Sequence, residues 1–153
     1  MELTYKAEVE GVASVTGFHC PPLVAKPVSR EAWRWIAYPQ TDQCFLPVAV
    51  RNPRRLLEDP EKQCSAWGLS MFTSKEAAEA VFLKLEKKIR NIRKTIGSHV
   101  GRVSLGPADG LCTPPDKGGH FDLHPIAKSF VALDVVELPK QAAKLSPVQG
   151  KKK

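Results

Sequence analysis

The segment Trp67–Phe82, with the sequence WGLSMFTSKEAAEAVF, constrains the fold more than any other part of the chain. Trp67–Phe72 is typical of a short buried strand, and a Thr-Ser turn leads from it directly into a helix. Thr73 and Glu76 have the spacing of a capping box, in which the threonine hydroxyl accepts from the Glu76 amide and the Glu76 side chain bonds back. The segment therefore predicts a strand end that meets a helix N-terminus, where N–H groups can contact a ligand.

The predicted helix continues to Ile96, a length of roughly six turns. Apolar residues recur every three or four positions along it, which places them on one face. They are Ala78, Val81, Phe82, Leu85, Ile89, Ile92 and Ile96. Gly97 follows as a natural residue after the helix end. We expect one long amphipathic helix that buries this face against a sheet.

Short strands surround this helix in the sequence. Apolar or alternating runs predict them at Leu3–Val9, Val12–Phe18, Ala32–Tyr38, Phe45–Val50, Trp67–Phe72, Val100–Leu105, Gly119–His124 and Ser129–Leu138. Prolines and glycines predict connections at His19–Pro27, Asn52–Lys62 and Gly106–Gly119. One helix among many strands favours an α+β fold with a bent or split, mostly antiparallel sheet. We predict a single globular domain over residues 1–138 and a basic flexible tail over residues 139–153.

The composition, 42% hydrophobic and 25% charged, is that of an ordinary globular protein. No apolar run approaches the roughly 20 residues that span a bilayer, and the N-terminus lacks the pattern of a secretory signal. We therefore expect a cytoplasmic protein with no membrane partner. The four cysteines match no common zinc spacing, so we predict no metal site. Without a secretory signal we expect no disulfide, and we predict that most of the cysteines are buried free thiols.

The net charge of +7 is concentrated in two places, the tail and the stretch Lys84–Lys94, which holds six basic residues and one acid. A basic helix face and tail can follow a phosphate backbone, although a solvated face is the alternative. The nucleic-acid-binding candidates are Arg51, Arg54, Arg55, Lys84, Lys87, Lys88, Arg90, Arg93 and Lys94.

The segment Gly118–His124 carries a second group of polar residues. If it is extended, His120, Asp122 and His124 share one face. The two histidines of a flat strand would lie about 13 Å apart, too far to bind one metal ion. The pattern therefore indicates a role in binding or proton transfer, and an exposed polar strand face is the alternative.

Arg34 lies between two tryptophans in the sequence AWRWIAY. On a strand the tryptophans take one face and the guanidinium takes the other. An arginine can hold a phosphate or a dinucleotide through two parallel hydrogen bonds, and a surface arginine is the alternative.

The motif L-S-M-F-T-S-x-x-x-A-x-x-x-F, from Leu69 to Phe82, resembles the second signature of the ADP-ribosyltransferase superfamily. In that family a strand ends in Ser-Thr-Ser or a similar set and a helix follows, whereas this chain has Ser-Met-Phe-Thr-Ser. The family's first signature, an Arg or His on an early strand, matches Arg34, and its late Glu matches Glu137.

The resemblance implies that NAD is the cofactor. Arg34 would contact its phosphate or ribose, Ser70 its nicotinamide ribose, and Glu137 or His120 would assist transfer. The chain is also similar to small bacterial proteins that share W-x-L-S-x-F and G-H-F-x-L-H, which implies a bacterial origin.

Three functions are compatible with these features. The first is a nucleic-acid-binding or accessory subunit of a bacterial system, such as a defence system, acting through the basic helix face and tail. The second is an ADP-ribosyltransferase-like enzyme or toxin that uses NAD. It requires the side chains of Arg34, Ser70, His120 and Glu137 to converge in one cleft, with Arg34 and Ser70 on the same side of the sheet. The third is a protein-interaction module of the antitoxin or immunity type, which requires an exposed apolar patch.

Overall fold

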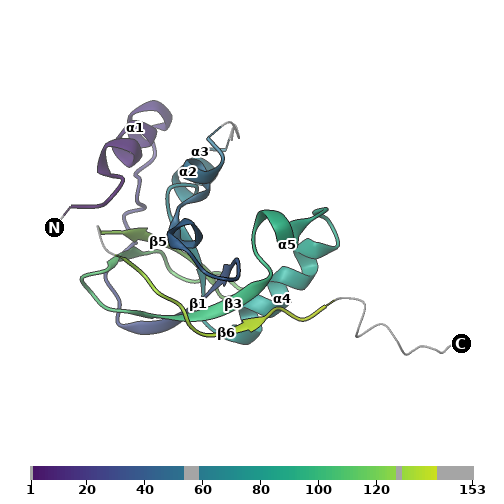
Figure 1. Cartoon of the computed structure of the whole chain (residues 1–153). Helices are drawn as coiled ribbons and strands as arrows, with labels where there is room; N and C mark the ends of the chain where they lie inside the picture. Colours follow the sequence, from purple (N-terminus) through teal and green to yellow (C-terminus); the bar gives the residue numbers. More distant parts are fainter. Residues whose placement is uncertain (1, 54–58, 127–128, 141–153) are drawn as a thin grey trace, which may run out of the picture.

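The computed structural model describes residues 2–53, 59–126 and 129–140, and its centre is a six-stranded antiparallel sheet (Figure 1). The strands are β1 (Arg30–Ile36), β2 (Leu69–Phe72), β3 (His99–Leu105), β4 (Gly110–Cys112), β5 (His120–Pro125) and β6 (Leu133–Glu137). Their order across the sheet is β4-β5-β2-β1-β3-β6, and every neighbouring pair is antiparallel. The predicted α+β class is therefore confirmed.

Short helices occupy the connections between the strands. They are α1 (Lys6–Thr16), the 3-10 helix η1 (Asp42–Phe45), α2 (Val48–Arg51), α3 (Pro60–Ser65), α4 (Lys75–Glu86) and α5 (Ile92–Thr95). Figure 1 shows α1, α2 and α3 above the sheet, while α4 and α5 lie together toward the C-terminal end of the described chain. No helix in the described residues is both long enough and apolar enough to cross a membrane.

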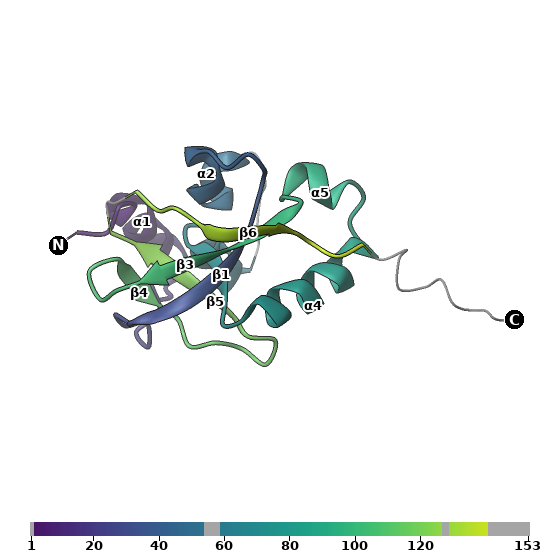
Figure 2. The same cartoon turned by 60° about the horizontal axis from the view of Figure 1, so that its bottom comes forward.

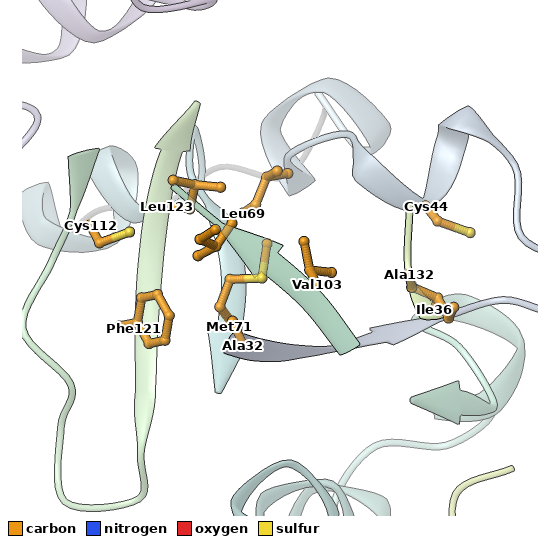
Figure 3. Close-up of a cluster of buried hydrophobic side chains, with 11 residues drawn as sticks. Ala32, Ile36, Cys44, Leu69, Met71, Val103, Cys112, Phe121, Leu123 and Ala132 are labelled. Carbon is orange, nitrogen blue, oxygen red and sulfur yellow. The ribbon is translucent and has the colours of Figure 1, made fainter. Parts of the chain in front are cut away.

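The main core lies on one face of the sheet. Side chains alternate between the two faces of a strand, and the inward residues of five strands meet in a single cluster (Figure 3). Leu69 and Met71 of β2 contribute to it together with Phe121 and Leu123 of β5, and all four are fully buried. Val103 of β3 joins them from across β1. The antiparallel sheet of the prediction is present, and this cluster is the core on one of its faces.

A second core lies on the other face of the sheet, where α4 packs. Phe82 and Ala78 of α4 contact Phe72 of β2 and Val100 of β3. The Trp35 indole N–H donates to the Ala78 carbonyl at 2.9 Å, which fixes the helix against β1. The strand–helix junction predicted from Trp67–Phe82 is therefore present.

The N-terminus of α4 differs from the predicted capping box by one residue. The Ser74 hydroxyl accepts from the Ala77 N–H at 3.0 Å and caps the helix. The Thr73 N–H instead donates to the Gly119 carbonyl, which ties Thr73 to the start of β5. Because Thr73 still belongs to the sheet, the helix begins one position later, and Glu76 has no role in the cap.

The prediction of one long helix over residues 75–96 is wrong. The helix α4 ends at Glu86, and Asn91 has φ of 60°, in the left-handed region that asparagine tolerates. The separate helix α5 turns out of line with α4 (Figure 2). The turn brings Arg93 back to Glu86 at 2.7 Å and over the Phe82 ring. It also leaves Ile89, which was expected to be buried, 39% exposed.

The two strands predicted before residue 19 are wrong, because Lys6–Thr16 forms α1. Lys6 and Glu10 form an i,i+4 ion pair at 3.1 Å, and Gly17 ends the helix with a left-handed φ of 79°. Of the α1 residues, Val9 is buried. Because α1 buries a single residue, its sequence does not need a continuous apolar face and shows only a weak helical periodicity.

The strand predicted at Phe45–Val50 is also wrong, because η1 ends at Phe45 and α2 begins at Val48. Pro47 is the residue before α2 and has extended backbone. Proline lacks the N–H that a paired strand donates to its neighbour, so it suits this position better than a strand interior. The connection predicted over Asn52–Lys62 contains the start of α3, where Asp59 caps the helix and Pro60 occupies its first turn.

The long connection predicted over Gly106–Gly119 contains the short strand β4. The predicted basic tail, apart from Pro139 and Lys140, lies outside the described residues.

The expectation that the chain has no disulfide is wrong. Cys20 and Cys64 form a disulfide, which joins the segment after α1 to α3. Cys44 and Cys112 are buried and free, as expected. Two cysteines 44 positions apart are brought together by the fold, which spacing alone does not predict.

Candidate functional site

The pairing of β2 with β5 places the predicted polar residues side by side. Ser70 lies directly opposite Asp122, and the next pair on that face is Phe72 with His120. The His120 Nε2 atom lies 2.6 Å from the Ser70 hydroxyl and 3.6 Å from an Asp122 carboxylate oxygen. Three side chains capable of proton transfer therefore meet at one point of the sheet.

Asp116, which the sequence did not single out, holds the other side of His120. One of its carboxylate oxygens accepts from the backbone N–H groups of Gly118 and His120, each at 2.9 Å. The other oxygen lies 4.0 Å from His120 Nδ1. Gly119 completes this turn with φ of 83°, and a Cβ atom there would meet the Thr73 hydroxyl at 2.7 Å. The turn before β5 therefore orients the imidazole toward Ser70.

Arg34 reaches the same place from β1. Its Nη1 donates to the Ser70 carbonyl at 2.8 Å, and its Nε donates to the Cys44 carbonyl at 2.9 Å. The register of β1 with β2 contains the single pair Trp33–Phe72. The Arg34 guanidinium therefore donates to the Ser70 carbonyl at the point where β1 and β2 stop pairing. Arg34 is 6% exposed, so the alternative of a surface arginine is wrong.

Among the described residues, the Arg34 guanidinium donates to neutral carbonyl groups and lies over the Phe45 ring at 5.8 Å. No Asp or Glu among the described residues forms an ion pair with it. Burial, together with the nearby Arg51 guanidinium, lowers the pKa of Arg34 to about 10. Two cations that face each other without an acid between them favour the entry of an anion.

A cavity of about 290 Å³ opens above these residues. It is lined by Arg34, Trp35, Leu46, Val48, Arg51, Lys62, Ser65, Ala66, Gly68, Ser70, Ile96, His120 and Asp122. We call it the basic cleft, because three of its side chains are cations and one is an acid. Burial raises the pKa of the Asp122 carboxyl, although the nearby His120 opposes this shift. The basic cleft therefore combines anion-binding groups with a desolvated carboxyl group.

His124, the third residue of the predicted polar face, is 2% exposed. Within the described part of the chain neither of its ring nitrogens has a hydrogen-bond partner. Burial lowers the pKa of His124 to about 4 from its ordinary value of 6.5. The side chain is therefore a neutral imidazole at pH 7, and the alternative of an exposed polar strand face does not apply to it.

The depressed pKa of His124 predicts a loss of stability in acid. Between pH 6.5 and 4 the unfolded chain binds a proton at His124 that the folded chain does not, so stability falls as pH falls. The full difference is worth on the order of 3 kcal/mol. Between pH 7 and 4 the free energy of unfolding should therefore fall by about 3 kcal/mol less in His124→Leu than in the wild type. Urea unfolding of both proteins at both pH values measures this difference. Equal losses in the two proteins would contradict this origin.

Glu137 does not join the basic cleft, so the expectation that it assists transfer there is wrong. It lies on β6 at the sheet edge, and β1 and β3 separate that strand from β2. Its carboxylate is 3.9 Å from the Lys140 ammonium, and its side chain is 57% exposed. The order of strands, which the sequence does not reveal, separates Glu137 from Ser70.

The predicted nucleic-acid-binding residues are distributed over several places. Arg51 lines the basic cleft and donates to the Thr95 carbonyl at 2.8 Å. Arg93 is neutralised by Glu86 and bonds the carbonyls of Leu138 and Pro139. The exposed members are Lys84, Lys87, Lys88, Arg90 and Lys94. Arg54 and Arg55 lie outside the described residues.

Within the described residues, no three His, Cys, Asp or Glu side chains are grouped in a way that could hold a metal ion. A scan of protein-family models and searches of curated proteins and of solved structures found no match to this chain.

Proposed function

We propose that the basic cleft binds the pyrophosphate of NAD and that the protein is an ADP-ribosyltransferase-like enzyme. The observation that carries this proposal is Arg34, a buried guanidinium whose described partners are two neutral carbonyls and the Phe45 ring, none of them an acid. A buried cation of this kind is costly unless a ligand supplies the counter-charge. Arg51 and Lys62 line the same cleft and add to the attraction for a diphosphate.

The location of Ser70 supports the choice of NAD among anionic ligands. The resemblance to ADP-ribosyltransferases requires its Arg and Ser positions to share one cleft. Arg34 and Ser70 both line the basic cleft, and the guanidinium bonds the Ser70 carbonyl. Strand alternation places the Arg34 side chain on the face of Ala32 and Ile36, and the Ser70 hydroxyl on the opposite face with Phe72. The guanidinium reaches the Ser70 carbonyl where β1 and β2 stop pairing, so both residues line the cleft although they start from different faces. The Ser70 hydroxyl lies 2.6 Å from His120, where it can contact a ribose hydroxyl.

In this proposal Asp122 takes the part that Glu137 was expected to play. Transfer breaks the bond between the ribose C1′ and the nicotinamide nitrogen, and nicotinamide leaves with the bonding electrons as a neutral ring. Positive charge develops on the ribose, and a nearby carboxylate stabilises it. Asp122 is the carboxylate that lines the basic cleft. His120 orients the Ser70 hydroxyl, and Asp116 orients His120.

Calorimetric titration of NAD into Arg51→Gln and Arg90→Gln tests this proposal. Both changes remove one exposed arginine charge, but only Arg51 lines the basic cleft. Loss of a charge-assisted hydrogen bond to phosphate should raise the Kd about tenfold in Arg51→Gln. We expect less than a twofold change in Arg90→Gln. Arg34→Lys should weaken NAD binding at least as much as Arg51→Gln does. Urea unfolding checks that the Arg34→Lys variant is folded.

Two results would contradict the proposal. One is a wild type that binds neither NAD nor ADP-ribose below about 1 mM, the weak end of specific affinities. The other is an equal affinity of NAD for the two single-charge variants, since the diphosphate would then lie outside the basic cleft.

Nucleic-acid binding is the second candidate function, and one observation favours it. Five exposed cations lie between the last turn of α4 and the end of α5, and the described residues offer no acid within ion-pair distance of them. We call this surface the basic ridge, formed by Lys84, Lys87, Lys88, Arg90 and Lys94. Such cations can neutralise backbone phosphates.

Fluorescence anisotropy with single-stranded and duplex oligonucleotides tests the basic ridge. Lys84→Gln/Lys87→Gln/Lys88→Gln should weaken binding and lower the slope of log K against log salt by about 2 to 3. The matched control is Lys6→Gln/Lys75→Gln/Lys140→Gln, since each of those lysines already pairs with an acid. Binding that is insensitive to salt, or that falls equally in both triple variants, would exclude this function.

A further inference from the structure

A second, larger cavity adjoins the basic cleft. Its volume is about 710 Å³, and it shares Lys62, Ser65, His120 and Asp122 with the basic cleft. The other walls come from the segment after α1, from α3 and from the turn before β5, including Phe18, Leu23 and Pro114. We call it the acidic cavity. A ligand in it would meet a ligand of the basic cleft at His120 and Asp122.

The two cavities carry opposite charge. Among the described residues, the acidic cavity is lined by three carboxylates, those of Glu61, Asp116 and Asp122, and by one lysine or arginine, Lys62. The basic cleft has the reverse balance, because Arg34 and Arg51 are absent from the acidic cavity. A negative potential in a cavity with low-dielectric walls attracts cations. The charge therefore selects a ligand opposite in sign to a diphosphate.

His124 is an independent observation that points to a ligand in the same cavity. It lines the acidic cavity, it is 2% exposed, and neither ring nitrogen has a partner in the described structure. A buried polar group without a partner destabilises the folded protein, so a ligand that hydrogen-bonds to it removes this penalty and binds more tightly. A neutral imidazole offers one lone pair, which accepts from an N–H donor.

The walls of the acidic cavity define the body of the ligand. Apolar side chains of Phe18, Pro22, Leu23 and Val24 line one side, and Phe18 and Leu23 are largely exposed. Burying such side chains against an aromatic or alkyl group is favourable. The volume lies within the range of small-molecule sites, roughly 300 to 1,000 Å³.

We infer that the acidic cavity binds an organic cation, an amidine, guanidine or amine with an apolar body, which donates N–H groups to Asp116, Asp122 and His124. Its role as the second substrate rests on the proposed function. In that reaction the acceptor nitrogen forms a bond to ribose C1′ as the bond from C1′ to nicotinamide breaks. The proton lost by the acceptor nitrogen passes to the Asp122 carboxylate, which borders both cavities.

Titration of the full chain with benzamidine, benzamide and benzoate tests the inference. These probes share one aromatic ring and differ in charge, so they separate the apolar and the electrostatic contributions. Benzamidine should bind at least tenfold more tightly than benzamide, and benzoate should not bind. Binding should shift the His124 ring resonances in the NMR spectrum.

Asp116→Asn and Glu61→Gln supply the matched variants. Asparagine keeps a side-chain oxygen for the Gly118 and His120 amides but removes the charge. We expect each variant to weaken benzamidine at least fivefold. Glu61→Gln should weaken NAD less than twofold, because Glu61 lines the acidic cavity but not the basic cleft. Glu79→Gln removes an acid on α4 that pairs with Lys75, and it should change neither affinity.

The outcomes separate this inference from the proposed function. Equal binding of benzamidine and benzamide, or benzamidine binding that neither acid variant weakens, would overturn the inference even if NAD binds. Selective benzamidine binding without NAD binding would support the cation site and remove its role as the second substrate.

Discussion

Replacing both Cys20 and Cys64 with serine should lower the free energy of unfolding by about 4 kcal/mol. The disulfide closes a loop of 44 positions, which includes β1, η1 and α2. The chain-entropy estimate for a loop of this length gives that value, and typical measured losses are about 2 to 4 kcal/mol. The large effect follows because a cross-link over a long loop strongly restricts the unfolded chain.

Urea unfolding with and without a reductant measures this loss. The reduced wild type should unfold at the same urea concentration as the double variant, and the reductant should not affect the variant. Because α3 carries Lys62 and Ser65 of both cavities, reduction should also weaken NAD binding. A loss below about 1 kcal/mol would show that the disulfide is not a major constraint on the fold.

Phe82→Ala should cost about 3 to 5 kcal/mol, the range for buried aromatic residues cut to alanine. Phe82 is 0% exposed, its ring lies 5.5 Å from the Trp35 ring, and the Arg93 guanidinium lies over it at 5.0 Å. The substitution leaves a cavity between α4 and the sheet and removes the cation–π contact.

Ile89→Ala is the matched control for Phe82→Ala. The sequence pattern places both residues on the same helix face, but the turn after Glu86 leaves Ile89 partly exposed. We expect Ile89→Ala to cost less than about 1 kcal/mol in urea unfolding, as for a residue near the surface. Similar losses in the two variants would indicate the continuous helix that the apolar periodicity predicts.

The sheet and the start of α4 could be predicted because their signals are local. Trp67–Phe72 and Val100–Leu105 are short apolar runs bounded by turns, and β2 and β3 lie within them. The turn after Glu86, where Asn91 has a left-handed φ and Arg93 pairs with Glu86, cannot be inferred from the spacing of apolar residues. The disulfide depends on the position of α3 relative to Cys20, which is also a tertiary feature. The helix α1 is not predicted because its apolar residues show only a weak helical pattern.

Part of the candidate site was also predictable. Arg34, Ser70 and His120 could be named because each stands in a distinctive local pattern, and all three line the basic cleft. Asp122 was placed on the correct face, but its position opposite Ser70 follows from the strand register. Glu137 was misplaced for the same reason, since only the strand order shows that β6 is remote from β2. The burial of His124 without a described hydrogen-bond partner could be found only from the packing.

The most direct test of the central claim is an NMR titration of the isotope-labelled full chain with NAD. Occupation of the basic cleft should shift the Arg34 Nε–Hε resonance and the backbone amides of Ser70 and His120 together, with one saturating curve. The amides of the basic ridge should stay unchanged. Shifts confined to Lys84–Lys94, or an unchanged Arg34 resonance at saturating NAD, would contradict the assignment of the cleft as the NAD site.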